Sequence, residues 1–228
     1  MQRRAATAVL STLVVALAAT GVVMVVLRAL LLAEAFSGNT PSPADPYDGG
    51  YARHPGLTLL HIVPGLVFVI LGPLQFATRI RARYTNLHRW CGRIYVASGA
   101  VVGVSALVLG VVVGFAGSTE TTAVTFFSTL FLISLGLAVF RIRRREVAAH
   151  REWMIRAFAL GLAVTTMRPM VGILTALAGL PFSEALGISF WLAFSLHLVL
   201  AECWISFTRT ERNPVSATVS VPSTSRFP

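Results

Sequence analysis

Apolar residues in this sequence fall into six long runs, separated by short polar or glycine- and proline-rich stretches. A helix needs about 20 apolar residues to cross the hydrocarbon core of a bilayer, which is roughly 30 Å thick. The runs cover residues 5–33, 57–78, 94–116, 122–140, 154–177 and 186–207. The pattern therefore predicts an all-α fold, with residues 1–208 forming one six-helix transmembrane bundle.

The polar stretches predict the loops and the end of the domain. Residues 36–56 are rich in Gly, Pro, Ser and Asp, which indicates a loop. Residues 209–228 are rich in Ser, Thr and Pro and predict a disordered cytoplasmic tail. The first run follows Arg3 and Arg4 like a signal peptide, but a secretory apolar region has only about 7–15 residues. We therefore expect the first helix to be retained.

The sequence has few charged residues, and its arginines fall mainly on one side of the predicted membrane. Only 12% of the residues are charged, against about a quarter in soluble domains, and the net charge of +10 comes entirely from arginine. With the N-terminus inside, nearly all arginines fall on the cytoplasmic side and only Arg53 lies in an outer loop. This asymmetry predicts cytoplasmic termini and a lipid bilayer with anionic headgroups as the basic face's partner, rather than nucleic acid.

Several classes of function lack support in the sequence. It has no P-loop, no dinucleotide fingerprint and no soluble domain large enough for a nucleotide site. Cys91 and Cys203 predict neither a disulfide framework nor a structural zinc site. Any chemistry would have to occur inside the bundle or at its surface, and the sequence leaves open whether the protein is an enzyme.

The third run carries small residues at helical spacing. Gly99 and Gly103 lie four residues apart, and Gly110 and Gly114 repeat the pair. Small residues at this spacing let helix backbones approach closely in lipid. The spacing predicts a tightly packed central helix.

Polar side chains inside the runs are expensive in lipid and therefore informative. Arg28 lies near the outer end of its run and can snorkel outward. Arg168 precedes Pro169 well inside the fifth run, where it either snorkels or meets an anion. Glu202 lies at a depth comparable with Arg156, which predicts a structural ion pair between the last two helices.

Four histidines sort into two pairs by their predicted depth. His61 and His197 fall in the outer half of two helices, whereas His88 and His150 lie at the inner ends of the third and fifth. The inner pair belongs to a repeated pattern, "NLHRWCGRIYV" and "AAHREWMIRAF", in which an arginine follows tryptophan by three residues. Each histidine alone is typical of packing or of the membrane interface.

Together the pairs have a known chemical use. A b-type haem needs two axial imidazoles at matching depth on facing helices and arginines near its propionates. This predicts His61 with His197 and His88 with His150 as candidate ligands of haem iron, and Arg168 as a propionate partner.

Residues 51–99 and 150–170 resemble a family of bacterial membrane proteins designated domain of unknown function 2306, and the likeness extends over roughly residues 50–205. The resemblance implies a multi-pass protein of the plasma (inner) membrane, without an established activity. The stretch "LHRWCG" (87–92) is similar to a ligand-bearing stretch of two-haem transmembrane b-type cytochromes. That likeness implies a ligand role for His88 alone, and the sequence departs from the cytochromes because the fourth run contains no histidine.

Two interpretations remain. In the first, the protein is a b-type haem electron carrier with a redox donor and acceptor. In the second, it is a non-redox membrane protein, either a small-solute or lipid-handling transporter or an accessory scaffold. There the histidines and arginines serve packing, proton relay or headgroup contact.

Overall fold

The computed structural model describes residues 2–36, 53–114 and 117–210. Its helices are α1 (Gln2–Phe36), α3 (Pro55–Phe76), α4 (Thr78–Arg83), α5 (Thr85–Val108), α6 (Ser118–Arg143), α7 (Val147–Ala178) and α8 (Phe182–Thr210), and a π-helical turn, η1 (Leu109–Val113), extends α5. Six of them are long and apolar enough to cross a membrane, α5 together with η1. The predicted six-helix all-α membrane fold is confirmed.

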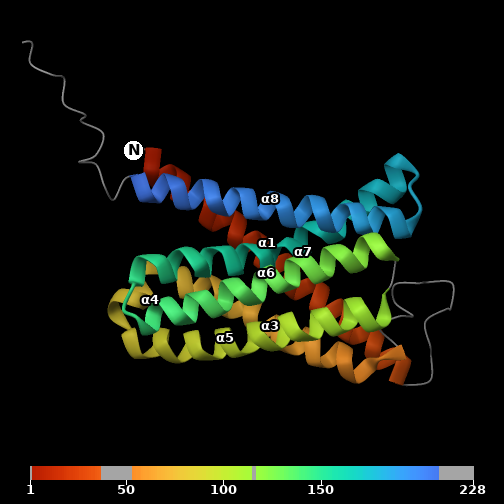
Figure 1. Cartoon of the computed structure of the whole chain (residues 1–228), viewed down its shortest axis with the longest axis horizontal. Helices are drawn as coiled ribbons and strands as arrows, with labels where there is room; N and C mark the ends of the chain where they lie inside the picture. The colour runs from red at the N-terminus through yellow and green to blue at the C-terminus, as the bar shows by residue number, and fades with distance from the viewer. Residues whose placement is uncertain (1, 37–52, 115–116, 211–228) are drawn as a thin grey trace, which may run out of the picture.

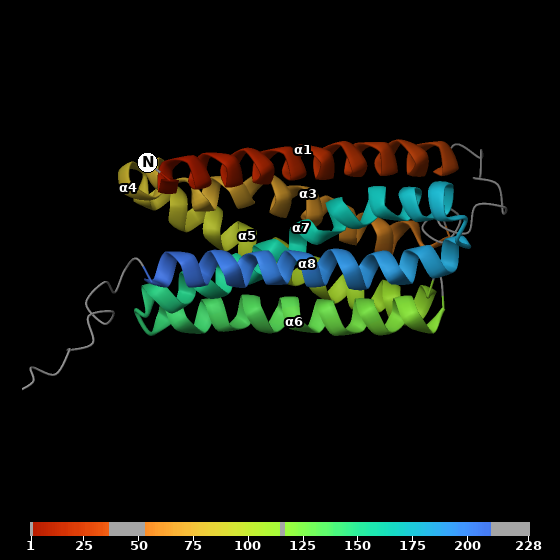
Figure 2. The same cartoon turned by 90° about the horizontal axis from the view of Figure 1, so that it is seen from above.

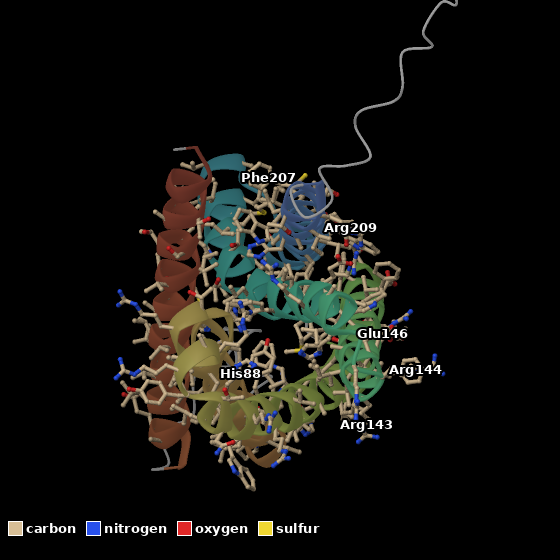
Figure 3. All side chains as sticks on the ribbon, turned by 90° about the vertical axis from the view of Figure 1, so that its left-hand side faces the viewer. His88, Arg143, Arg144, Glu146, Phe207 and Arg209 are labelled. Atoms are coloured by element: carbon tan, nitrogen blue, oxygen red, sulfur yellow. The ribbon has the colours of Figure 1, made fainter. Side chains whose placement is uncertain are left out.

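The long helices share one axis and pack side by side (Figures 1 and 2). Helix α5 packs against α3 and α6, and α7 packs against α6 and α8. Helix α1 lies across α3 and α7. Seen along the axis, α3, α5, α6 and α7 surround the interior, while α1 and α8 lie outside this group (Figure 3). A site inside the bundle is therefore built mainly by these four helices.

Local sequence sets the helix ends. Pro55 occupies the first turn of α3, where its missing N–H costs nothing. Gly114 and Gly179 take left-handed backbone conformations, with φ of 48° and 65°, and end η1 and α7. Gly114 therefore serves helix termination, unlike the three preceding glycines of its predicted stripe. Arg145, at φ 62°, makes the sharp turn that returns the chain from α6 to α7.

The start of α1, α4, the turn between α6 and α7 and the end of α8 all lie at one end of the bundle (Figure 1). Arg143, Arg144 and Arg209 are labelled there in the end-on view (Figure 3). We call this the arginine-rich end. Alternating passes bring together the arginines that the sequence assigns to one side of the membrane.

Reporter fusions test the predicted orientation. A reporter placed after Arg145 or at the C-terminus should read cytoplasmic, and one inserted within residues 37–50 should read external, because arginines favour the cytoplasmic side. Of the predicted loop, residues 37–52 lie outside the described residues, and its ends belong to α1 and the start of α3. Of the predicted tail, residues 211–228 lie outside the described residues, and its first two residues belong to α8. An external signal after Arg145 would reverse the assignment.

Two helices begin well before the residues at which the hydrophobic runs start. α5 begins at Thr85 rather than at residue 94, and α7 at Val147 rather than at residue 154. The added turns are rich in Arg, Trp and Glu, which lower the local hydropathy but are compatible with helix. His88 and His150 consequently lie inside the first turns of α5 and α7, instead of preceding them.

The small-residue face of α5 is packed closely, as the spacing predicts. A Cβ atom added at Gly103 would lie 2.6 Å from Leu132 Cδ2, and one at Gly110 would lie 2.6 Å from Val124 Cγ1. Both neighbours belong to α6, so these glycines allow α5 and α6 to approach.

Candidate functional site

A cavity of about 440 Å³ lies in the half of the bundle away from the arginine-rich end. Parts of all six long helices line it, and its walls are mostly apolar. The charged and imidazole side chains at its surface are Arg28, His61, Glu120 and Arg168. We call this the central cavity. Its volume falls within the roughly 300–1,000 Å³ typical of small-molecule sites.

Glycines help to leave this space open. Five glycines line the central cavity, each from a different element: Gly21, Gly65, Gly103, Gly110 and Gly161. At Gly161 an added Cβ would lie 2.4 Å from Phe68 Cε1, so Phe68 can occupy its position only because residue 161 has no side chain. Phe68 forms part of the cavity wall.

His61 is held in one orientation by α5. Its Nδ1 lies 2.9 Å from Ser105 Oγ, and the Ser105 hydroxyl donates to the Val101 carbonyl at 2.7 Å. With its proton used in that bond, Ser105 accepts from Nδ1–H. The imidazole then has Nε2 as the nitrogen that can accept a bond from a ligand. His61 is half-buried and close enough to Arg168 for a direct electrostatic interaction.

The charged lining residues come from three helices. Arg28 projects from α1, Glu120 from the first turn of α6, and Arg168 from α7 just before Pro169. Among the described residues at the cavity surface, two guanidinium groups and one carboxylate leave a formal excess of one positive charge. Arg28 is half-buried at this wall.

Glu120 is a site residue that the sequence analysis missed. It falls just before the fourth apolar run, where the hydropathy pattern predicts a loop, yet only 2% of its surface is exposed. The signal that could have identified it is the helix start at Ser118, since an acidic residue in a first turn is favoured by the helix dipole.

His197 lies elsewhere. Its Nδ1 donates to the Ala159 carbonyl at 3.1 Å, and its Nε2 lies 2.9 Å from the Thr166 hydroxyl, both on α7. It does not line the central cavity, and α3, which carries His61, does not pack against α8. Both ring nitrogens of His197 are engaged, so this geometry gives no support to His61 and His197 as an axial pair.

The inner histidines, His88 and His150, lie closer to the predicted arrangement than the outer histidines do. His88 and His150 lie near enough to interact electrostatically. The His150 Nδ1–H donates to the Ala138 carbonyl at 2.8 Å, whereas the His88 Nδ1 is buried without a partner. Figure 3 shows His88 at the arginine-rich end.

The repeated His-Arg-Trp pattern has a structural use in both copies. The Arg93 guanidinium lies 4.8 Å from the centroid of the Trp90 ring, and Arg156 lies 4.5 Å from that of Trp153. Residues three apart on a helix are neighbours, so each pair forms a cation–π contact within one turn. The arginine and tryptophan of each copy therefore stabilise the helix start.

The predicted ion pair between α7 and α8 is confirmed. Arg156 Nε donates to Glu202 Oε1 at 2.5 Å, and a second nitrogen donates to Oε2 at 2.9 Å. Glu152 and Arg209 form a second pair between the same helices. Both ion pairs hold α8 against α7 near the arginine-rich end. Their role is therefore structural.

A haem would find part of its ligand set here. At the central cavity, His61 Nε2 and two arginines fit an iron ligand and propionate partners, but the second predicted imidazole is engaged elsewhere. At the inner pair, His88 and His150 lie near enough to interact electrostatically. Within the described residues no three His, Cys, Asp or Glu side chains gather to hold a metal ion, and two imidazoles suffice for haem.

Comparison with known proteins identifies the family and nothing more specific. The family model described as "Predicted membrane protein (DUF2306)" matches residues 58–205, from α3 to the end of α8. No curated protein and no solved structure matches the chain. The matched region covers well over half of the sequence and contains most of the central cavity. The chain belongs to the DUF2306 family of predicted membrane proteins.

Proposed function

We propose that this protein binds an amphipathic anion in the central cavity and handles it within the plasma (inner) membrane. The observation that carries the proposal is an apolar cavity with two arginine side chains, Arg28 and Arg168, at its surface. An apolar body would contact the aromatic and aliphatic walls. A carboxylate or phosphate would lie against Arg168 and Arg28.

The electrostatics favour an acidic ligand over a neutral one. A half-buried arginine in a membrane interior is stabilised by an anion, because charges interact more strongly away from water. Carboxylate and phosphate groups also match the fork of guanidinium donors. His61 Nε2 can accept a hydrogen bond from a protonated or hydroxyl-bearing part of the same ligand.

The position of α1 supports handling of molecules from the bilayer. It contributes one wall of the central cavity, from Gly21 to Leu31, while most of its described side chains face outward. It packs only against α3 and α7 among the long helices. A modest displacement of α1 would connect the cavity with the surrounding lipid. This favours a lipid-handling role over that of a scaffold.

Haem b is the second candidate, because it is itself an apolar ring with acidic side chains. The observation that favours it is the Ser105 contact of His61, which leaves Nε2 as an iron ligand beside the arginines. A haem bound there, or between His88 and His150, would make the protein an electron carrier between a donor and an acceptor.

Native mass spectrometry of the detergent-purified protein tests the proposal. Phosphatidylglycerol, oleate and haemin are added separately, and the bound fraction is titrated for the wild type and for Arg168→Gln. Losing a hydrogen bond to a charged group costs about 1.5–3 kcal/mol, so we expect affinity for the preferred anion to fall roughly tenfold to a hundredfold. Arg168→Lys should retain part of it.

Arg89→Gln is the matched control, since Arg89 is exposed at the arginine-rich end and far from the central cavity along α5. It should bind like the wild type. Preference for haemin with a sharp b-type spectrum would select the haem interpretation within the same ligand class. Equal binding by wild type and Arg168→Gln for all three probes would contradict the proposed site.

A further inference from the structure

Among the buried polar atoms without partners in the described residues, three belong to α3 and α5 on the side of the arginine-rich end. They are Gln75 Nε2 on α3, and His88 Nδ1 and Tyr95 Oη on α5. Gln75 is 8% exposed and Tyr95 is fully buried. We call these three residues the polar cluster. None of them lines the central cavity.

The helix register places the three side chains in one column. His88 and Tyr95 are two turns apart on the same face of α5, which separates them by about 10 Å along the axis. Gly92 lies between them on that face, and a Cβ added there would be 3.2 Å from Gln75 Oε1. Gln75 therefore fills the level between His88 and Tyr95, and Gly92 provides the room for it.

Leaving such atoms unpaired is costly. An unsatisfied buried donor or acceptor costs about 1–3 kcal/mol, and nearly all buried polar groups in folded proteins have a partner. Three along one face point to an occupant. The amide donates two protons, the imidazole offers one nitrogen in either role, and the phenol can donate and accept. A buried water typically makes about three such bonds.

We infer that the polar cluster binds a short chain of ordered water that enters from the arginine-rich end. The chain begins at half-buried His88, in the first turn of α5, and passes Gln75. It ends at Tyr95, whose ring stacks on Phe68 with a centroid distance of 4.2 Å. Phe68 is also part of the wall of the central cavity. A hydrated inlet and the central cavity thus approach one another from opposite ends, separated by the Phe68–Tyr95 pair.

Water explains the cluster better than a haem between His88 and His150. A haem would use an imidazole as its iron ligand, and it could pair with Gln75 and Tyr95 only through its propionates. Water satisfies all three residues.

Radiolytic hydroxyl labelling of the protein in lipid nanodiscs tests the inference, because radicals form from water held beside a buried side chain. Tyr95 should be oxidised despite its burial, with exposed Tyr84 reporting the dose. In Gln75→Leu and in His88→Leu the water loses partners, so labelling of Tyr95 should fall severalfold while labelling of Tyr84 stays constant. Thermal unfolding of each variant, followed by circular dichroism, confirms that the folded state is the one labelled.

Absence of Tyr95 oxidation in the wild type, or labelling unchanged in both folded variants, would overturn the inference. A b-type spectrum that disappears in His88→Ala would also overturn the inference, because it would show that haem rather than water occupies the site. The inference is independent of the proposed function: Gln75→Leu should leave anion binding at the central cavity unchanged.

Discussion

Replacing Gly103 by leucine is expected to abolish most of the folded yield of the protein. Even a single Cβ at this position would lie 2.6 Å from Leu132 Cδ2 and 3.0 Å from Phe131 Cδ1. A full leucine side chain must push α5 away from α6, and overpacking a well-filled interior costs about 1–3 kcal/mol or more. Fluorescence-detected size-exclusion chromatography and thermal unfolding in detergent measure the loss.

Gly136→Leu is the matched control. Gly136 lies in the middle of α6, on its exposed side, and no atom lies within 4 Å of an added Cβ. The leucine would face lipid, and helix propensity would favour it over glycine. Gly136→Leu should therefore fold at least as well as the wild type. If both leucine variants were tolerated equally, the contact between α5 and α6 would not be as close as described.

The contrast between these glycines also shows what the sequence could predict. The four-residue spacing of Gly99 and Gly103 identified a packed helix face, because small residues at that interval have few other uses in a lipid-facing helix. Gly136 is isolated, and no spacing pattern predicts that it faces inward. Hydrophobic length likewise predicted all six spans, because the bilayer imposes a minimum length on every crossing.

The candidate site was harder to predict, because depth along a helix does not determine which way a side chain points. His61 and His197 fall in predicted outer halves, yet they face different partners: Ser105 on α5 for one, Ala159 and Thr166 on α7 for the other. Which helix lies beside which is a property of tertiary packing. The Arg156–Glu202 pair was predictable because an unpaired charge in the membrane interior is costly. Opposite charges at the same depth on consecutive helices are therefore expected to pair.

The polar cluster lay beyond sequence reasoning for a related reason. Gln75 falls near the end of an apolar run, and Tyr95 resembles any interfacial tyrosine. Their significance appears only when α3 and α5 are placed together, with Gly92 opposite Gln75. His88 was singled out as an iron ligand. The packed helices add two neighbours that favour water.

Phe68→Ala is expected to have the second large effect. Phe68 is 2% exposed, stacks on Tyr95 and contacts the rings of Phe131 and Phe158. Truncating a buried phenylalanine costs about 3–5 kcal/mol in soluble proteins. Here it also removes the ring that separates the central cavity from the polar cluster. We therefore expect lower thermal stability together with proton leakage through the bundle, measured in liposomes that contain a pH-sensitive dye and carry an imposed potential.

Phe127→Ala separates the two effects. Phe127 is equally buried and also lines the central cavity, but its ring partners are Phe126, Trp191 and Phe194, and it makes no ring contact with Tyr95. Its truncation should cost similar stability and enlarge the cavity without joining it to the inlet. Leakage from Phe68→Ala alone would mean that water reaches Tyr95 from one side and the cavity from the other. Equal leakage from both variants would reflect general loosening of the bundle. If folded Phe68→Ala caused no proton leakage, Phe68 alone would not separate the central cavity from the polar cluster.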